Sequence, residues 1–427
     1  MKRTILLITL LFVAFISEAQ VLSVQKQAQT INEVLTDRID NLLPKLMDEA
    51  NIDCWLIISR EYNEDPILKT FLPAEWLSAR RTTMLLFYRD KKNNTLKSYA
   101  IARYQVGKRI QAAWNPEQEP NQWMALSKLI DSLNPNKIGL NNSMNYGHAD
   151  GLHVTEFNEL KKVLAPSQYK KIVSAEKLGV AWLETRTEKE MALYPTLLAI
   201  THQIIKEGFS NQVIQPNQTT TNDLVWWFRQ KVSDLGLSTW FHPSIEIQRR
   251  VTNEKDAIIR RGDLLHVDFG ISYLRLNSDV QEHAYLLLPN ETAAPAELVA
   301  AFSKTNRLQD ILTSTFKTGR TGNEILASSI QQAKVEGIQP SIYTHPIGFH
   351  GHAAGTTIGM WDMQQGVPGS GDYAMRQNTC YSIELNAMHQ LKGWDKPVKI
   401  ALEQNGCYNG SGFEYLDGRQ KLLHLIQ

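Results

Sequence analysis

The first half of the chain contains short apolar runs and longer stretches with helical spacing. Over residues 20–48, apolar side chains recur every three or four positions, which predicts an amphipathic helix. Short apolar segments at 54–59, 83–88, 98–104 and 137–143 predict strands, and 122–134 predicts a helix ended by Pro135. Helices that alternate with strands in this way predict an α/β domain.

A second set of elements begins near residue 180. Thr187 followed by Glu190 predicts a helix start with a capping box, and the pattern at 221–236 predicts a helix closed by Gly236. Strand-like segments dominate from residue 239, interrupted by helical patterns at 294–315 and 322–336. We therefore expect an α/β (α+β) chain with domains over 20–178 and 179–427.

The N-terminus has the pattern of a cleaved secretory signal. Lys2 and Arg3 precede an apolar segment at 5–16, which is too short to span a bilayer comfortably. Ser17-Glu18-Ala19 then places small residues at the −3 and −1 positions of a cleavage site. We expect residues 1–19 to be removed and the mature protein to be secreted or periplasmic, with no membrane segment.

Composition and charge exclude some partners. The 427 residues are enough for two domains with sizeable cores, and 43% of them are hydrophobic. The formal net charge of +1 gives no electrostatic reason to expect nucleic acid or an anionic membrane as a partner. Of the three cysteines, Cys54 lies in an apolar run and is expected in a core, while Cys380 and Cys407 could pair or be free.

The candidate chemistry lies in the second domain. Asp268 and Asp279 are eleven residues apart in two strand-like runs joined by a turn, and Glu384 and Glu403 lie in the apolar runs CYSIEL and VKIALE. A histidine-rich segment, HPIGFHGHAAG at 345–355, lies between the two pairs. Carboxylates in apolar strands are costly unless they are paired or bind metal. The set predicts ligands for two divalent ions, because paired metals are held by bridging carboxylates.

The order Asp, Asp, His, Glu, Glu resembles the metallopeptidases of the pita-bread fold, such as aminopeptidase P, prolidase and creatinase-like proteins. The resemblance covers roughly residues 180–427, and the preceding region resembles the N-terminal domain of the creatinase branch only loosely. It implies an N-terminal creatinase-like α/β domain, a C-terminal pita-bread catalytic domain, a small peptide substrate and often a homodimer. Oxygen-rich ligation suits Mn²⁺, with Zn²⁺ and Co²⁺ as alternatives.

The resemblance also implies roles for single residues. Gly351-His352-Ala353-Ala354-Gly355 matches the family's Gly-His-x-x-Gly segment, which makes His352 the expected metal ligand and His350 the alternative. His345 and His350 are then expected to orient substrate or carry a proton. Asp268, Asp279, Glu384 and Glu403 complete the ligand set, with Glu384 also as the base for a bridging water.

In that alignment the chain departs from proline-cleaving relatives. The position seven residues beyond His352 is Gly359, where those relatives have a second histidine. Residues 245–256, where they have another histidine before the first aspartate, contain none. The arginine often found shortly after the second aspartate is replaced by Gln281-Glu282-His283. His242 lies before the 245–256 segment, and His345, His350, Asp362 or Arg250 could fill the vacated roles. We therefore expect weak activity on Xaa-Pro peptides.

The leading hypothesis is an exported dinuclear aminopeptidase or dipeptidase that cleaves near a peptide's N-terminus, with proline specificity left open. The alternatives are a creatinase-type carbon–nitrogen hydrolase and a binding protein on the same fold that has lost catalysis. A serine hydrolase of the nucleophile-elbow type is excluded, because no G-x-S-x-G motif is present.

Overall fold

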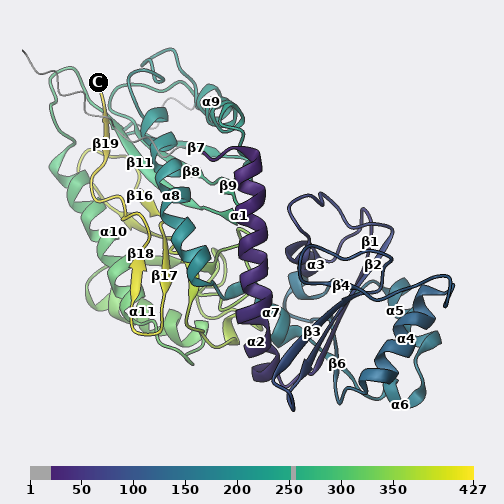
Figure 1. The fold of residues 1–427 in the computed structure, drawn as a ribbon. Coiled ribbons are helices and arrows are strands. Elements are labelled where there is room, and N and C mark those ends of the chain that lie inside the picture. Colours follow the sequence, from purple (N-terminus) through teal and green to yellow (C-terminus); the bar gives the residue numbers. More distant parts are fainter. Residues whose placement is uncertain (1–20, 252–255) are drawn as a thin grey trace, which may run out of the picture.

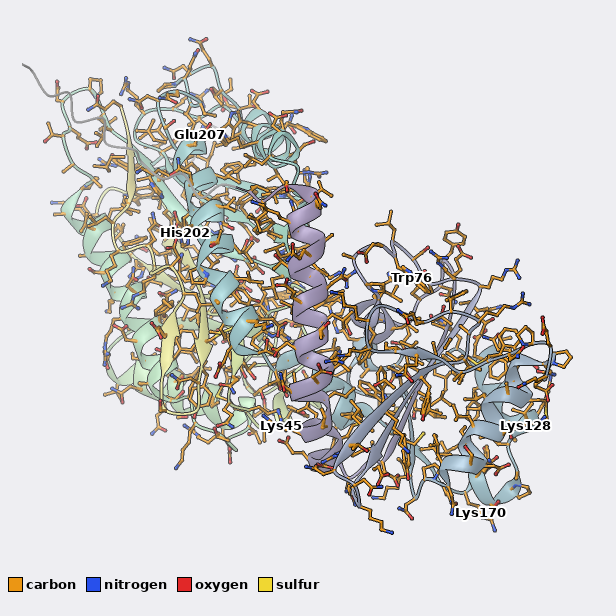
Figure 2. The ribbon with its side chains drawn as sticks, in the orientation of Figure 1. Lys45, Trp76, Lys128, Lys170, His202 and Glu207 are labelled. Atoms are coloured by element: carbon orange, nitrogen blue, oxygen red, sulfur yellow. A yellow bond between two sulfur atoms is a disulfide. The ribbon has the colours of Figure 1, made fainter. Side chains whose placement is uncertain are left out.

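The computed structural model describes residues 21–251 and 256–427, so the predicted signal segment lies outside the described residues. Figure 1 shows two bodies, with the first long helix running along the boundary between them. Figure 2 shows Trp76 and Lys128 on the first body and His202 and Glu207 on the second. Within the described ranges, no helix has the length and apolar character that a membrane crossing requires.

The first body is built on a six-stranded sheet in the order β4-β3-β2-β1-β5-β6, antiparallel from β1 to β3 and parallel from β1 to β6. Alternate side chains of β1 enter two different cores, with Trp55 on one face and Leu56 on the other. The expected strands are present, although the one at 98–104 ends early. The strands are β1 Cys54–Arg60, β2 Thr82–Asp90, β3 Thr95–Ala100, β4 Gln111–Ala112, β5 Ile138–Leu140 and β6 Ile172–Ser174.

Helices cover both faces of this sheet. The helix expected at 20–48 forms, but a π-helical turn at Arg38–Leu42 divides it. Its first half packs against both bodies, since Ile31 contacts the second core and Leu35 belongs to the first. The helices are α1 Val24–Asp37, α2 Leu43–Ala50, α3 Pro66–Phe71, α4 Gln122–Leu133, α5 Val154–Val163, α6 Pro166–Tyr169 and α7 Glu176–Glu184.

The second body opens with a capped helix, as the sequence predicts. The Thr187 side chain accepts a hydrogen bond from the Glu190 backbone N–H (3.3 Å), and the Glu190 carboxylate accepts one from the Thr187 N–H (2.9 Å). Helices α8 (Glu188–Gly208) and α9 (Thr221–Asp234) pack against one apolar core. Helices α10 (Ala296–Ser314) and α11 (Gly322–Val335) pack against another.

Three sheets of this body carry the strands of interest. The first has the order β19-β11-β8-β7, the second β12-β15-β16 and the third β13-β14-β17-β18, while β9 and β10 form a separate hairpin. A backbone bridge between Gln281 and Glu403 joins the first sheet to the segment between β16 and β17. The strands are β7 Ser244–Gln248, β8 Leu264–Phe269, β9 Ser272–Tyr273, β10 Leu276–Asn277, β11 Val280–Leu286, β12 Pro340–Ile342, β13 His345–Pro346, β14 Thr379–Ser382, β15 Leu385–His389, β16 Val398–Leu402, β17 Asn405–Tyr408, β18 Phe413–Tyr415 and β19 His424–Ile426.

The cysteines take two different states. Cys380 and Cys407 face each other across β14 and β17 and form a disulfide, which decides between the two alternatives that the sequence left open. Cys54 is a buried free thiol in the first body, as expected.

Candidate metal centre

The strand register brings the two aspartates to one end of the first sheet. Asp268 lies near the end of β8 and Asp279 directly precedes β11. Leu265, Val267 and Phe269 of β8 enter the apolar core, so the alternate position Asp268 faces the other way. The aspartates therefore stand where the polar faces of two antiparallel strands meet.

Glutamate and histidine side chains reach the same place from the other sheets. Glu384 lies between β14 and β15, and Glu403 lies between β16 and β17. His345 begins β13 and pairs with Ser382 of β14. Residues far apart in the sequence thus converge because three sheets end at a common point.

Among the described residues, three overlapping groups of three side chains could each hold a metal ion. Within each group, the candidate ligand atoms all lie within 4.8 Å of one another. Each of the three residues Asp279, His345 and Glu403 belongs to two of these groups. The groups are Asp268 with Asp279 and Glu403, His345 with Glu384 and Glu403, and Asp279 with His345 and His352.

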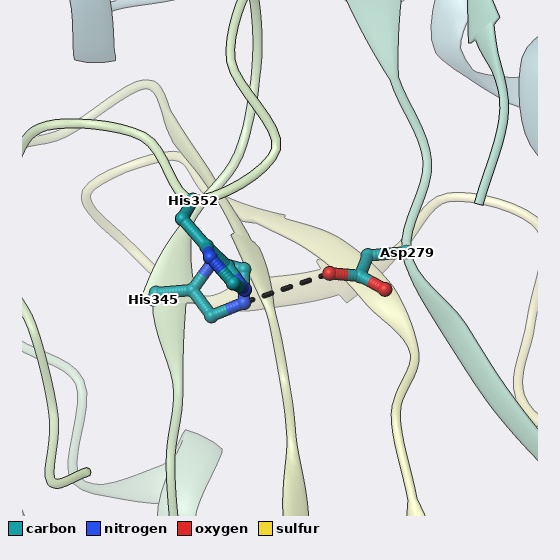
Figure 3. Close-up of side chains that lie close together, drawn as sticks. All are labelled: Asp279, His345 and His352. Carbon is teal, nitrogen blue, oxygen red and sulfur yellow. Dashed lines mark ion pairs between the residues drawn. The ribbon is translucent and has the colours of Figure 1, made fainter. Parts of the chain in front are cut away.

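The His345 ring points into this cluster. Its Nε2 lies 3.7 Å from Asp279 Oδ2 and 3.6 Å from Glu403 Oε1, and Figure 3 shows the contact with Asp279. Its Nδ1 lies 3.0 Å from the carbonyl oxygen of Pro346, which can only accept, so Nδ1 carries a proton. In the neutral ring, Nε2 therefore turns a bare lone pair towards two carboxylates.

A polar framework holds the carboxylates in position. The Asn405 amide oxygen accepts from the Asp279 backbone N–H (3.0 Å), and the Ser382 hydroxyl donates to Glu403 Oε1 (2.7 Å). The Gln281 amide donates to Glu384 Oε1 (3.0 Å) and to Glu403 Oε2 (2.8 Å). These bonds orient the acidic side chains while leaving oxygen lone pairs free to bind a cation.

The electrostatics of the cluster favour a cation. Burial, followed by repulsion from Glu403, raises the pKa of both Asp268 and Asp279 well above the ordinary range. The pKa of Glu384 is raised for the same two reasons. Partial desolvation of the ring and the neighbouring His345 lower the pKa of His352 to about 4, so this ring is neutral near pH 7 although part of the residue is exposed to solvent.

The residues present fit the binding of divalent metal. Asp268 Oδ1 and His345 Nε2 are buried without a hydrogen-bond partner, which is costly unless another group binds them. Four carboxylates and an imidazole match the ligands of two-metal hydrolytic sites, in which the ions lie about 3.5–4 Å apart. Oxygen-rich ligation of this kind suits hard ions such as Mn²⁺.

The other candidate residues lie elsewhere. The ring of His350 lies outside the three groups and is tilted against the ring of His148 of the first body, with centroids 4.3 Å apart. His242 contacts Arg229, and Arg250 contacts Tyr285. Asp362 is exposed.

Sequence reasoning missed the residues that support the carboxylates, namely Gln281, Ser382 and Asn405. A usable signal was present, because strand alternation places residue 281 on the same face as Asp279. From the sequence alone, Gln281 stands out only because it lies where an arginine is often found in the resembled family.

Comparisons with known proteins show the family and the fold of the chain. The profile of metallopeptidase family M24 matches residues 196–414, more than half of the chain. An X-Pro aminopeptidase from Thermotoga maritima superposes with a TM-score of 0.64 at 15% identity, covering 90% of this chain and all of that one.

Two further solved structures have similar folds. A Xaa-Pro dipeptidase from Bacillus anthracis gives a TM-score of 0.58 at 16% identity, covering 94% of this chain and 100% of that chain. A prolidase from Pyrococcus horikoshii gives 0.56 at 15% identity, with coverage of 92% and 99%. Comparison with curated protein sequences gives no significant match. At these identities the structural likeness concerns the fold, and together with the profile match it shows that the chain is a member of metallopeptidase family M24 with the pita-bread fold.

Proposed function

We propose that this protein is a dinuclear metal-dependent exopeptidase that removes an N-terminal residue from short peptides, with proline as the preferred second residue. The observation that carries the proposal is the overlap of the three ligand groups at Asp279, His345 and Glu403, since shared ligands are what a pair of neighbouring ions requires. The preference for proline is suggested by the structural neighbours, two of which are an X-Pro aminopeptidase and a Xaa-Pro dipeptidase.

The contacts favour His345 over His352 as the metal ligand. His345 belongs to two ligand groups and is buried, whereas His352 belongs to one group and is exposed. Its protonated Nδ1 also leaves Nε2 as the donor atom, which is the usual arrangement of a metal-binding histidine. His352 then stands seven residues beyond the ligand, so the chain does have the second histidine that the His352-based alignment appeared to lack.

The side chains around the ligands suit peptide hydrolysis. Two bound divalent ions would supply an activated water and polarise the scissile carbonyl. Glu384 is the proposed base for that water's proton. His352, neutral near pH 7 and 4.7 Å from the His345 ring, is proposed to hydrogen-bond the substrate and assist proton transfer to the leaving amine. Trp240 flanks His352 with its ring centroid 5.1 Å away and would limit the water around it.

The proposal is tested by loading the purified protein with Mn²⁺ and measuring kcat/KM on matched Xaa-Pro and Xaa-Ala peptides. We expect two ions per chain by elemental analysis and higher kcat/KM on the proline peptides, with activity abolished by a chelator. Binding of two ions with cleavage of neither peptide would favour the non-catalytic binding protein. Failure to bind any divalent ion in the micromolar range would remove the basis of the proposal.

We further propose that the protein is exported. The N-terminal pattern supports this, and so does the Cys380–Cys407 disulfide, because such bonds persist mainly in oxidising compartments. Expression in a bacterial host with a secretion pathway should yield a mature chain beginning at Gln20, as measured by intact mass. A soluble product in the cytoplasmic fraction that keeps Met1 would contradict export.

A further inference from the structure

We infer that Gln281, held in place by His266, is a positioning residue that orients Glu384 and Glu403 for metal binding. The inference rests on the proposed dinuclear function. It assigns a role to a pair of residues that lies behind the ligands.

The Gln281 amide has its orientation set by its neighbours. Its nitrogen donates to Glu384 Oε1 (3.0 Å) and to Glu403 Oε2 (2.8 Å), so one N–H is available for each carboxylate. Ionised carboxylates only accept hydrogen bonds, so the reverse orientation of the amide would place oxygen against oxygen. Gln281 is 6% exposed, which leaves little water to compete for these bonds.

His266 fixes the other end of the same amide. Gln281 Oε1 lies 2.9 Å from His266 Nε2, and because an amide oxygen only accepts, Nε2 carries the proton. On the far side of the ring, Nδ1 lies 3.7 Å from a carboxylate oxygen of Glu246. The chain of contacts runs from the half-exposed Glu246 through His266 and Gln281 to the two glutamates.

A second histidine keeps the His266 ring in place. The rings of His266 and His283 lie 5.0 Å apart. The His283 ring is fixed by backbone bonds, since its Nδ1 lies 3.0 Å from the Leu265 carbonyl oxygen and its Nε2 accepts from the Ala401 N–H (3.1 Å). Burial and the nearby His266 lower the pKa of His283 to about 3, in keeping with a neutral ring that serves as a fixed support.

Strand geometry explains why these residues line up. Alternation places His266 on the same face of β8 as Asp268, and the antiparallel register sets Gln281 opposite Asp268 and His283 opposite His266. The Gln281 backbone also pairs with that of Glu403, with Gln281 N–H donating to the Glu403 carbonyl oxygen at 3.0 Å. Both the backbone and the side chain of Gln281 therefore set the position of Glu403.

Loss of this support should weaken metal binding. Without Gln281, Glu384 Oε1 and Glu403 Oε2 would lose a buried donor, and the two side chains could rotate away from productive positions. Residues that orient metal ligands from behind typically contribute about 10–100-fold in metal affinity or activity.

The test compares Mn²⁺ affinity by calorimetry and the visible spectrum of the Co²⁺-loaded protein across a small set of variants. We expect Gln281→Met, which keeps the length of the side chain, to weaken Mn²⁺ binding by about 10–100-fold and to alter the Co²⁺ bands. His266→Leu should act in the same direction, whereas His266→Gln, which can still donate to residue 281, should restore most of the affinity. The double variant that combines His266→Leu with Gln281→Met should bind Mn²⁺ no more weakly than Gln281→Met alone, because the two residues act through one contact.

Gln168→Met is the matched control. Gln168 is also a buried glutamine, but it lies in α6 of the first body, where its amide donates to Asp131 Oδ1 (2.6 Å) and accepts from the Ala165 backbone N–H (2.9 Å). It should lower the melting temperature of the metal-free protein while leaving Mn²⁺ affinity unchanged. Wild-type affinity and spectrum in Gln281→Met, with the wild-type protein binding two ions, would overturn this inference alone. A wild-type protein that binds no divalent ion would overturn it together with the proposed function.

Discussion

Replacing Asp279 with Asn should abolish binding of at least one of the two metal ions and lower kcat/KM by about 10³-fold or more, about 4 kcal/mol of transition-state stabilisation. Asp279 belongs to two of the three ligand groups, so its charge acts on both proposed ion positions. Without that charge, two neighbouring cations repel each other with less compensation. Elemental analysis and steady-state kinetics on one Xaa-Pro peptide would measure the two effects together.

In the metal-free protein, Asp279→Asn should make the melting temperature depend less on pH. Burial and the Glu403 charge raise the pKa of Asp279, so the folded protein holds this proton more tightly than the unfolded chain does. The metal-free wild type therefore loses stability as pH rises from about 4, the ordinary aspartate value, through the raised pKa. The variant has no such proton to lose, and its melting temperature should fall less between pH 6 and pH 8.

A suitable control for this variant is Asp234→Asn, which changes an exposed carboxylate near the end of α9. It should bind two ions and melt like the wild type at every pH. Wild-type metal stoichiometry in Asp279→Asn would show that Asp279 is not a shared ligand.

The two histidines should separate metal binding from turnover. We expect His345→Ala to lose metal affinity, because its Nε2 lies 3.7 Å from Asp279 Oδ2 and 3.6 Å from Glu403 Oε1 and could bind an ion together with both carboxylates. We expect His352→Ala to keep two ions but to lose about 10²–10⁴-fold in kcat, the usual contribution of general acid–base assistance. Calorimetry with Mn²⁺ and kinetics at saturating Mn²⁺ distinguish the two results.

The opposite pattern would support the assignment that the sequence motif favoured. If His352→Ala loses metal and His345→Ala loses only turnover, then His352 is the ligand. If only His350→Ala loses metal, the ligand lies two residues from His352, and the contact between His350 and His148 must rearrange on metal binding.

Local patterns were enough to predict much of the fold. The capping box at Thr187 and Glu190 depends on residues three positions apart, so the start of α8 was readable directly. The apolar spacing of α1 likewise predicted a helix, because it too depends on residues close in sequence. The π-helical turn that separates α1 from α2 was not predicted. The strands β1, β2 and β5 also appeared where short apolar runs predicted them.

The sequence by itself also determined which acidic residues to consider. Carboxylates in apolar, strand-like surroundings are rare enough that Asp268, Asp279, Glu384 and Glu403 stand out without any structure. The structure brings all four into overlapping groups.

Only the tertiary structure decided which histidine faces them and what holds them. His345 and His352 lie in one short segment, and a local motif favoured the second. The pairing of β13 with β14 turns His345 towards Glu403, while the His352 side chain, further along the same segment, is exposed to solvent. Gln281 likewise gains its role from pairing with Glu403, a residue 122 positions away. Contacts of this kind depend on how separate sheets meet, and no short-range pattern encodes that.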